Sequence, residues 1–189
     1  MNNMSQHPQK KQKGFTLVET LVGITVLLVA IVGPMTMAAR GLQSAFHARD
    51  QITAVYLGQE AIEIIRAQRD QNALTRASWL TGISAACDRS NVAGCGVSAR
   101  APTTYLNCAT SANTCVINDS GSVGSQRGFY IHGGSSTPTP FTRRIWVEQI
   151  SGSREAEVTV DVSWQSGLFA SVRTVRLQSR IFNHYDFLD

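Results

Sequence analysis

Lys13-Gly14-Phe15-Thr16-Leu17-Val18-Glu19 is the stretch that decides the fold, because of the segment that it introduces. Directly after it, residues 20–39 form 20 consecutive uncharged positions, mostly Leu, Val, Ile, Ala, Met and Thr. Twenty residues of α-helix span ~30 Å, which is the thickness of the hydrocarbon core of a bilayer. The sequence therefore predicts an apolar helix near the N-terminus that is long enough to cross a membrane.

The charges around this run predict its orientation. The three lysines of the chain, Lys10, Lys11 and Lys13, all precede it, and the first acidic residue is Glu19. Positive charge before a membrane helix predicts that residue 1 is cytoplasmic and that the bulk of the chain lies outside the inner membrane. Beyond residue 14 the chain carries 14 arginines against 13 acidic residues. The formal net charge of +4 is therefore mostly a property of the N-terminal tip.

Hydropathy alone leaves two simple interpretations of this segment open. One is a cleaved secretory signal cut near Thr36-Met37-Ala38, but its apolar region exceeds the usual roughly 7–15 residues and begins at a glutamate. The other is a plain single-pass anchor, which fits the length. Glu19 is unexplained in such an anchor, since a carboxylate at the membrane boundary costs up to ~3 kcal/mol.

The basic leader, the glycine, the aromatic residue, the short apolar run and the glutamate together resemble the processing site of type IV prepilins. In that family a membrane-embedded prepilin peptidase cuts after the glycine and N-methylates the new first residue. The resemblance implies removal of a leader of residues 1–14, cleavage between Gly14 and Phe15, and methylation of Phe15. It also implies that Glu19 occupies the fifth mature position, which the family keeps as glutamate.

Elementary electrostatics agrees with a role for Glu19 in assembly. After cleavage, Phe15 carries an ammonium group in apolar surroundings, where an isolated ammonium and an isolated carboxylate are both strongly disfavoured. Pairing Glu19 with the amino group of Phe15 in a neighbouring subunit relieves both charges and fixes the axial register. We therefore expect Glu19 to align subunits in a filament.

Gly33 and Pro34 are a weak point in the expected membrane and assembly helix, residues 15–39. A proline lacks the N–H donor and clashes with the preceding turn, and the adjacent glycine weakens the helix further. A simple kink is one expectation, because glycine and proline are common in membrane helices. The resemblance to pilins implies the other, a region that bends or melts on assembly.

The pattern of residues 40–76 is amphipathic and predicts a helix that lies on a sheet and ends at about Gln71 or Leu74. The stretch 54–66 is similar to minor pilins of the PilV kind and to related small pseudopilins. The residues expected to recur along the helix at spacings of three and four are Ala45, Ala48, Ile52, Val55, Gln59, Ile62 and Arg66.

All four cysteines fall in residues 77–140, a Ser-, Thr- and Gly-rich segment expected to be a loop. Structural zinc sites usually place two cysteines about two to four residues apart, and neither end of this series does so, hence no metal is expected. Outside the membrane, disulfides are expected instead. The favoured pairing is local, Cys87 with Cys95 and Cys108 with Cys115, and a nested pairing is the alternative.

From residue 141 onward the pattern predicts strands at 142–150, 155–164 and 171–181, with residues 128–132 as a candidate addition. Residues 155–164 alternate cleanly between apolar and polar side chains, as a half-buried antiparallel strand does. The inner face of this meander needs a cover, and the amphipathic helix is the long element available. The predicted fold class is α+β and pilin-like, with a long N-terminal helix packed on a small antiparallel sheet of residues 141–189.

No pattern predicts an enzyme or a cofactor. The histidines form no HExxH or i, i+4 ligand pair, and the sequence has no nucleophile elbow, phosphate loop or dinucleotide fingerprint.

Nucleic-acid binding is expected to be weak, because carboxylates lie on the same strands as the basic residues. Mixed-sign cross-strand pairs are the simpler interpretation of that pattern. The arginines concerned are Arg143, Arg144, Arg173, Arg176 and Arg180, and the carboxylates are Glu148, Glu155, Glu157 and Asp161.

The resemblance implies a structural protein, a minor pilin that the inner-membrane assembly machinery joins to other pilin subunits in a type IV pilus. Such a pilus would support adhesion, motility or DNA uptake. A type II secretion pseudopilin is the alternative within the family, and a membrane-anchored extracytoplasmic binding module is the alternative outside it. The expected location is first the inner membrane, with a cytoplasmic N-terminus, and then a surface pilus or a periplasmic pseudopilus.

Overall fold

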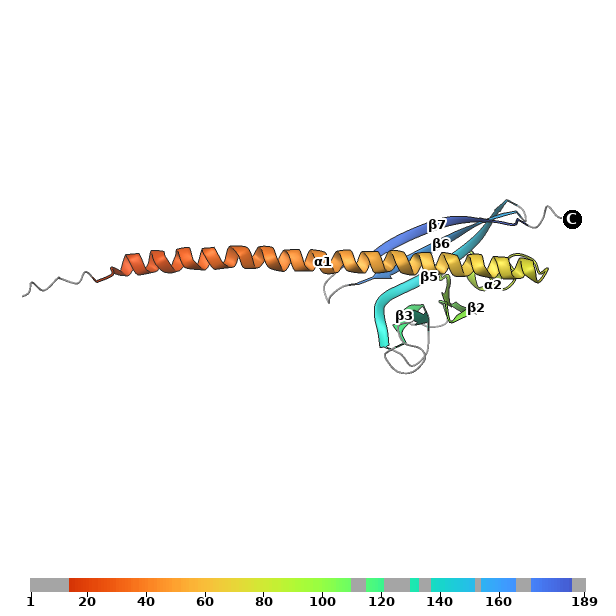
Figure 1. Ribbon diagram of the computed structural model, residues 1–189, viewed down its shortest axis with the longest axis horizontal. Coiled ribbons are helices and arrows are strands. Elements are labelled where there is room, and N and C mark those ends of the chain that lie inside the picture. The colour runs from red at the N-terminus through yellow and green to blue at the C-terminus, as the bar shows by residue number, and fades with distance from the viewer. Residues whose placement is uncertain are drawn as a thin grey trace, which may run out of the picture. The chain divides into compact units, whose positions relative to one another are not determined.

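The computed structural model describes residues 14–109, 115–120, 130–132, 137–151, 154–165 and 171–184 (Figure 1). Most of the expected leader therefore lies outside the described residues. The chain divides into two compact units, one ending at Phe46 and the other beginning at His47. Each unit is treated by itself below.

Helix α1 runs from Leu17 to Leu74 and contributes to both units. Thr16 caps its start, because the Thr16 hydroxyl accepts a hydrogen bond of 3.3 Å from the backbone N–H of Glu19. Thr-x-x-Glu at this position is the pattern of a capping box. At the other end, Arg76 adopts a left-handed conformation with φ of 55°, and the Ala77 N–H donates to the Asn72 carbonyl at 2.9 Å. That bond pattern closes a helix, and it ends α1 where the amphipathic pattern predicted.

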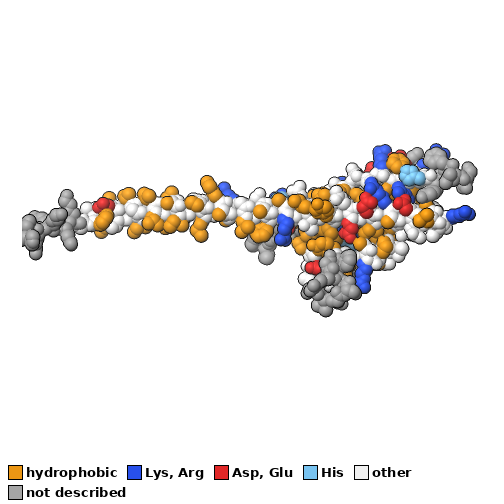
Figure 2. Space-filling model, viewed as in Figure 1, with side chains coloured by type: hydrophobic (Ala, Val, Ile, Leu, Met, Phe, Trp, Pro, Cys, Tyr) orange, Lys and Arg blue, Asp and Glu red, His pale blue; other side chains and the backbone are white. Residues whose placement is uncertain are grey.

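In the first unit, α1 is apolar and exposed. By length and composition it is able to cross a membrane, and Figure 2 shows hydrophobic side chains all along it. The helix continues through Gly33 and Pro34, so the predicted weak point is not a break in the helix. A proline removes one backbone donor, and here the Thr36 hydroxyl adds a bond of 2.8 Å to the Gly33 carbonyl. A kink or local melting at this point stays a prediction.

The second unit contains a seven-stranded sheet in which every strand pairing is antiparallel. Strand β5 is its longest strand and lies at its centre. One edge of β5 pairs with β6, which pairs in turn with β7, and the other edge pairs with β1 and β3, which are extended by β2 and β4. The elements are α2 (Ser84–Cys87), β1 (Cys95–Ser98), β2 (Ala101–Asn107), β3 (Val116–Asp119), β4 (Tyr130–His132), β5 (Thr137–Ser151), β6 (Glu155–Trp164) and β7 (Arg173–Phe182).

The structure confirms the α+β architecture and adds strands where a loop was expected. The meander β5–β6–β7 corresponds to the three predicted strands, whereas residues 77–140 also contain α2 and β1–β4. The candidate strand at 128–132 is described only from Tyr130 to His132, and it pairs with β3 rather than with the meander. These additional strands are short, and β1 is buried at all four positions, so they carry little of the alternation that identifies a strand.

The hydrophobic core of the second unit lies between α1 and the sheet. From α1, the fully buried residues Ala54, Ala61 and Ile65 belong to the same core cluster as the inward-facing valines of β6. Gly58 allows a close approach to the sheet, because a Cβ atom there would lie 2.6 Å from Cδ1 of Leu177 on β7. Each fully buried Val or Ile side chain contributes about 1.5–3 kcal/mol to such a core.

Two disulfides join the short elements of the second unit to one another. Cys87 at the end of α2 is bonded to Cys95 at the start of β1, and Cys108 after β2 is bonded to Cys115 before β3. All four cysteines of the chain are therefore paired. This is the local pairing that the spacing favoured over a nested one.

Candidate functional site

The expected processing site lies in the non-helical segment that precedes α1. Gly14 and Phe15 are exposed, with 77% of the Phe15 surface accessible. Apart from the residues next to it in the chain, no described residue lies within 4 Å of the position that a Gly14 Cβ would take. The peptide bond between them is therefore not hidden by the described part of the fold. A bond in this position is accessible to a peptidase.

Glu19 lies in the first turn of α1, where the unpaired N–H groups of a helix favour a negative charge. Its side chain is exposed, and among the described residues no basic group pairs with its carboxylate. The Thr16 hydroxyl holds only the backbone of Glu19. The carboxylate is thus positioned by the helix and is available to a cation from outside the described chain.

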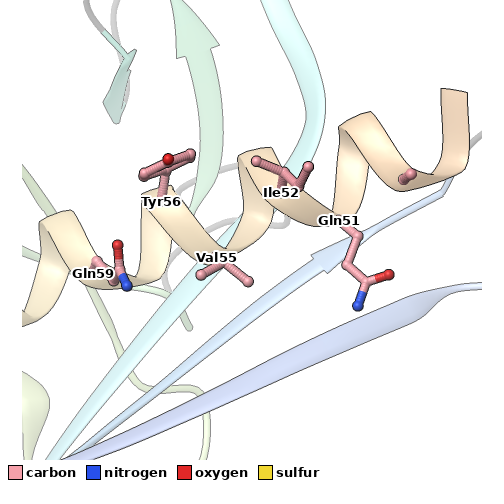
Figure 3. Close-up of a pocket in the computed structure, with 6 residues that line it drawn as sticks. Gln51, Ile52, Val55, Tyr56 and Gln59 are labelled. Atoms are coloured by element: carbon pink, nitrogen blue, oxygen red, sulfur yellow. The ribbon is translucent and has the colours of Figure 1, made fainter. Parts of the chain in front are cut away.

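A groove with a volume of about 460 Å³ lies beside α1 in the second unit (Figure 3). Two of its apolar side chains are largely exposed, Ile52 at 57% and Tyr56 at 67%. The residues expected to recur at spacings of three and four divide between the two sides of the helix. Ile62 is buried, whereas Ile52 and Gln59 are exposed, and Ala54, Leu57 and Ala61 contribute to the core. The groove is lined by Ala48, Gln51, Ile52, Val55, Tyr56 and Gln59.

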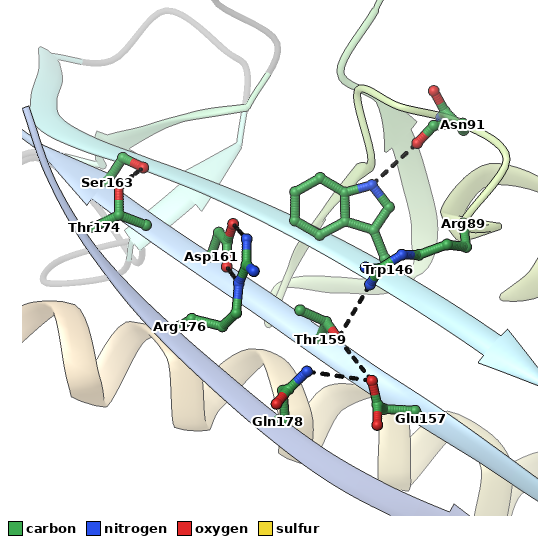
Figure 4. Close-up of polar contacts among 10 residues, drawn as sticks. All are labelled: Arg89, Asn91, Trp146, Glu157, Thr159, Asp161, Ser163, Thr174, Arg176 and Gln178. Atoms are coloured by element: carbon green, nitrogen blue, oxygen red, sulfur yellow. Dashed lines mark hydrogen bonds and ion pairs between the residues drawn. The ribbon is translucent and has the colours of Figure 1, made fainter. Parts of the chain in front are cut away.

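The face of the sheet opposite the core carries paired charges rather than a basic patch (Figure 4). Arg176 donates two hydrogen bonds of 2.7 Å to the two carboxylate oxygens of Asp161, its cross-strand partner, and this contact raises the pKa of Arg176. Arg180 pairs with Glu155 at 2.9 Å. The mixed-sign interpretation of these strands is therefore the one that the structure supports.

Arg143 was grouped with those surface arginines, and the structure places it elsewhere. Its side chain is fully buried on the core side of β5, where it contacts Glu60 and two backbone carbonyls. Burial lowers the pKa of its guanidinium, and the Glu60 carboxylate opposes that effect. The sequence contained the signal, because Phe141, Arg143, Ile145 and Val147 fall on one face of an alternating strand.

The described histidines lie in different parts of the second unit. His47 stacks on Trp164 with ring centroids 6.3 Å apart, His184 lies near Phe182, and His132 is buried next to Gly96. Within the described ranges, no group of three or more His, Cys, Asp or Glu side chains is arranged to hold a metal ion.

Comparison with known proteins adds one finding for the N-terminal region. Residues 9–33 match the family model described as the prokaryotic N-terminal methylation motif. No curated protein and no solved structure shows significant similarity to the chain. The match covers the expected cleavage bond, Glu19 and the start of α1, and it supports a type IV pilin or pseudopilin-like precursor that is a substrate of prepilin peptidase.

Proposed function

We propose that this chain is the precursor of a minor pilin, cleaved between Gly14 and Phe15, methylated on Phe15 and assembled into a type IV pilus. The observation that carries the proposal is the methylation motif at residues 9–33, placed directly before an exposed apolar helix. An uncleaved anchor needs neither the motif nor a glutamate in its first turn.

The exposed face of α1 in the second unit supports assembly through helix contacts. Ile52 and Tyr56 are both more than half exposed, and they lie outside the run of residues 20–39 that is long enough to fill a bilayer. Exposed apolar side chains beside a groove are typical of protein interfaces. The proposed occupant of this groove is the apolar helix of a neighbouring subunit.

The minor role rests on the similarity of residues 54–66 to PilV-type subunits and on the disulfide-closed insertion between α1 and β5. A pseudopilin shares the N-terminal motif but assembles with a secretion apparatus. Quantitative mass spectrometry of sheared surface filaments distinguishes the two. We expect this subunit in the pili as a small fraction of the major subunit, and its recovery only with a secretion complex would contradict a pilus role.

The N-terminus itself tests the processing step. In cells that contain prepilin peptidase, we expect a mature chain that begins with methylated Phe15, and in cells without the peptidase an intact leader. Glu19→Ala should leave cleavage unchanged and abolish incorporation into filaments, because the Phe15 ammonium group then has no partner. Glu19→Asp is the matched control that keeps the charge. An intact N-terminus in the presence of the peptidase would overturn the proposal.

A further inference from the structure

Arg143 joins three elements of the second unit through one guanidinium group. Its Nη1 donates to the Leu57 carbonyl at 2.8 Å and to Oε2 of Glu60 at 2.9 Å, both on α1. Its Nη2 donates to the Val97 carbonyl on β1 at 2.5 Å. Because Arg143 itself lies on β5 and is 0% exposed, the contact links the helix to the centre of the sheet inside the core.

The same turn of α1 also packs closely against β7. Gly58 lies between Leu57 and Glu60, and a Cβ atom at Gly58 would lie 2.6 Å from Leu177 on β7. The arginine bonds and the glycine contact therefore act on one helical turn. The arginine bonds hold the helix over β5 and β1, and the glycine allows the same turn to approach β7 closely.

The rest of the helix–sheet contact specifies the position of α1 less strictly. Small or apolar side chains recur one turn on either side of Gly58, and two of them, Ala54 and Ala61, are 0% exposed. Apolar burial is proportional to area and is not directional. A shift by one turn would bring Ala54 or Ala61 toward Leu177, whose side-chain end would have to turn aside to admit the added Cβ. Charge-assisted hydrogen bonds are directional, and a buried ion pair is better evidence for a defined arrangement than for stability.

We propose that Arg143 and Glu60 form a register lock, which selects one axial and rotational position of α1 on the sheet from positions that lie one helical turn apart. The lock also determines which helix face is turned outward. With Leu57 and Glu60 held against Arg143, Ile52 and Tyr56 remain exposed beside the groove. The inference concerns the second unit alone and does not depend on filament assembly.

Cysteine cross-linking in the full-length chain, extracted from membranes in mild detergent, tests the lock. The native cysteines are all in disulfides, so an added pair reports on position. Gly58→Cys with Leu177→Cys reports the observed register, and Ala54→Cys or Ala61→Cys with Leu177→Cys reports shifts of one turn. In the otherwise unchanged chain, we expect the Gly58 pair to link and the two shifted pairs to remain mostly unlinked.

Arg143→Met keeps an unbranched apolar stem of similar reach to the arginine Nε and removes the charge and the donors. We expect the ratio of in-register to shifted product to fall by at least about tenfold, because the variant loses all three hydrogen bonds of the guanidinium and the loss of one bond to a charged group corresponds to about tenfold. Arg143→Lys keeps the charge without the planar fork and should give an intermediate ratio. Arg144→Met is the matched control, because Arg144 is the next residue of β5 and is exposed. It should leave the ratio unchanged.

Correct formation of the two native disulfides identifies folded chains in each preparation. An unchanged ratio in folded Arg143→Met would overturn the register lock. A failure of both Arg143→Met and Arg143→Lys to fold would also overturn it, because a group that only selects a register must leave a folded chain. An equal fall of the ratio in Arg144→Met would show that any loss of charge from β5 loosens the helix, which contradicts the role assigned to Arg143.

Discussion

At the scale of single residues, the buried polar groups differ in how many hydrogen-bond partners they have. Arg143 finds three acceptors, whereas the buried hydroxyl of Tyr105 on β2 has no hydrogen-bond partner among the described residues. Burial raises the pKa of Tyr105 to about 12. The neutral phenol is therefore favoured by the fold, and the phenolate is disfavoured.

Tyr105→Phe should be neutral or slightly stabilising at neutral pH, because it removes a buried group that gains no hydrogen bond. The tyrosine of the unfolded chain loses its proton near pH 10, and that of the folded chain near pH 12. The stabilising effect of Tyr105 burial is therefore complete below about pH 10 and is lost as the pH rises to about 12, by about 2–3 kcal/mol.

Denaturant unfolding of the wild type and of Tyr105→Phe across this alkaline range measures the effect. The wild type should lose stability more steeply than the variant, and the difference should appear only above about pH 10. Parallel loss in both proteins would show that Tyr105 ionises with the same pKa in the folded and unfolded states.

At the scale of elements, the sequence predicted the regular parts of the fold and missed the irregular ones. The bounds of β6, Glu155–Trp164, match the predicted strand, because its alternation is complete. The end of α1 was also within the predicted range. In contrast, β1 to β4 are three to seven residues long. These strands pair with segments that are far away in the sequence. The alternation of apolar and polar residues within one short segment does not indicate such pairings.

The two disulfides should differ in their rates of reduction, although they close loops of similar length. Cys87 and Cys95 are both 0% exposed, whereas Cys108 is partly exposed. A soluble thiol must reach a sulfur atom in order to attack it. We therefore expect Cys108–Cys115 to be reduced first, and a chain with Cys87–Cys95 intact to accumulate.

Timed alkylation followed by peptide mass spectrometry measures this order. A denatured sample is the control, since both disulfides are equally accessible there and should be reduced at similar rates. Early labelling of Cys87 and Cys95 in the native protein would contradict the prediction. Replacing either cysteine pair by alanine should lower the free energy of unfolding by about 2–3 kcal/mol, the loop-closure contribution for loops of this length.

At the scale of the whole molecule, the excess positive charge is concentrated at the N-terminal end of the chain, and the rest of the chain is nearly neutral. The lysines lie within the first 13 residues, and the 14 arginines nearly balance 13 acidic residues. On the sheet, the balance is local, because Arg176 and Arg180 are joined to Asp161 and Glu155. These mixed pairs were expected from the sequence. The inward position of Arg143 was not, although the alternation of β5 places Arg143 on the same face as Ile145 and Val147.

This balance predicts weak binding to DNA by the mature protein. Affinity for DNA depends on the number of phosphates that basic groups neutralise, and paired arginines are less available for that role. Binding measured by fluorescence anisotropy should be weak and should fall steeply between low and physiological salt. Asp161→Asn, which releases Arg176, should strengthen binding at low salt, and a tight complex of the wild type that resists salt would contradict the prediction.

The central position of β5 has a consequence for how the protein is made. β1, β3 and β6 all attach to this strand, yet β5 begins only at Thr137. The inner face of α1 is therefore synthesised long before β5, β6 and β7 exist to cover it. Pairings between segments that are distant in the chain form slowly, because a long loop must close first. The folding of this chain consequently includes an extended interval in which the apolar inner face of α1 is uncovered, and that interval ends only when β5, β6 and β7 have been synthesised.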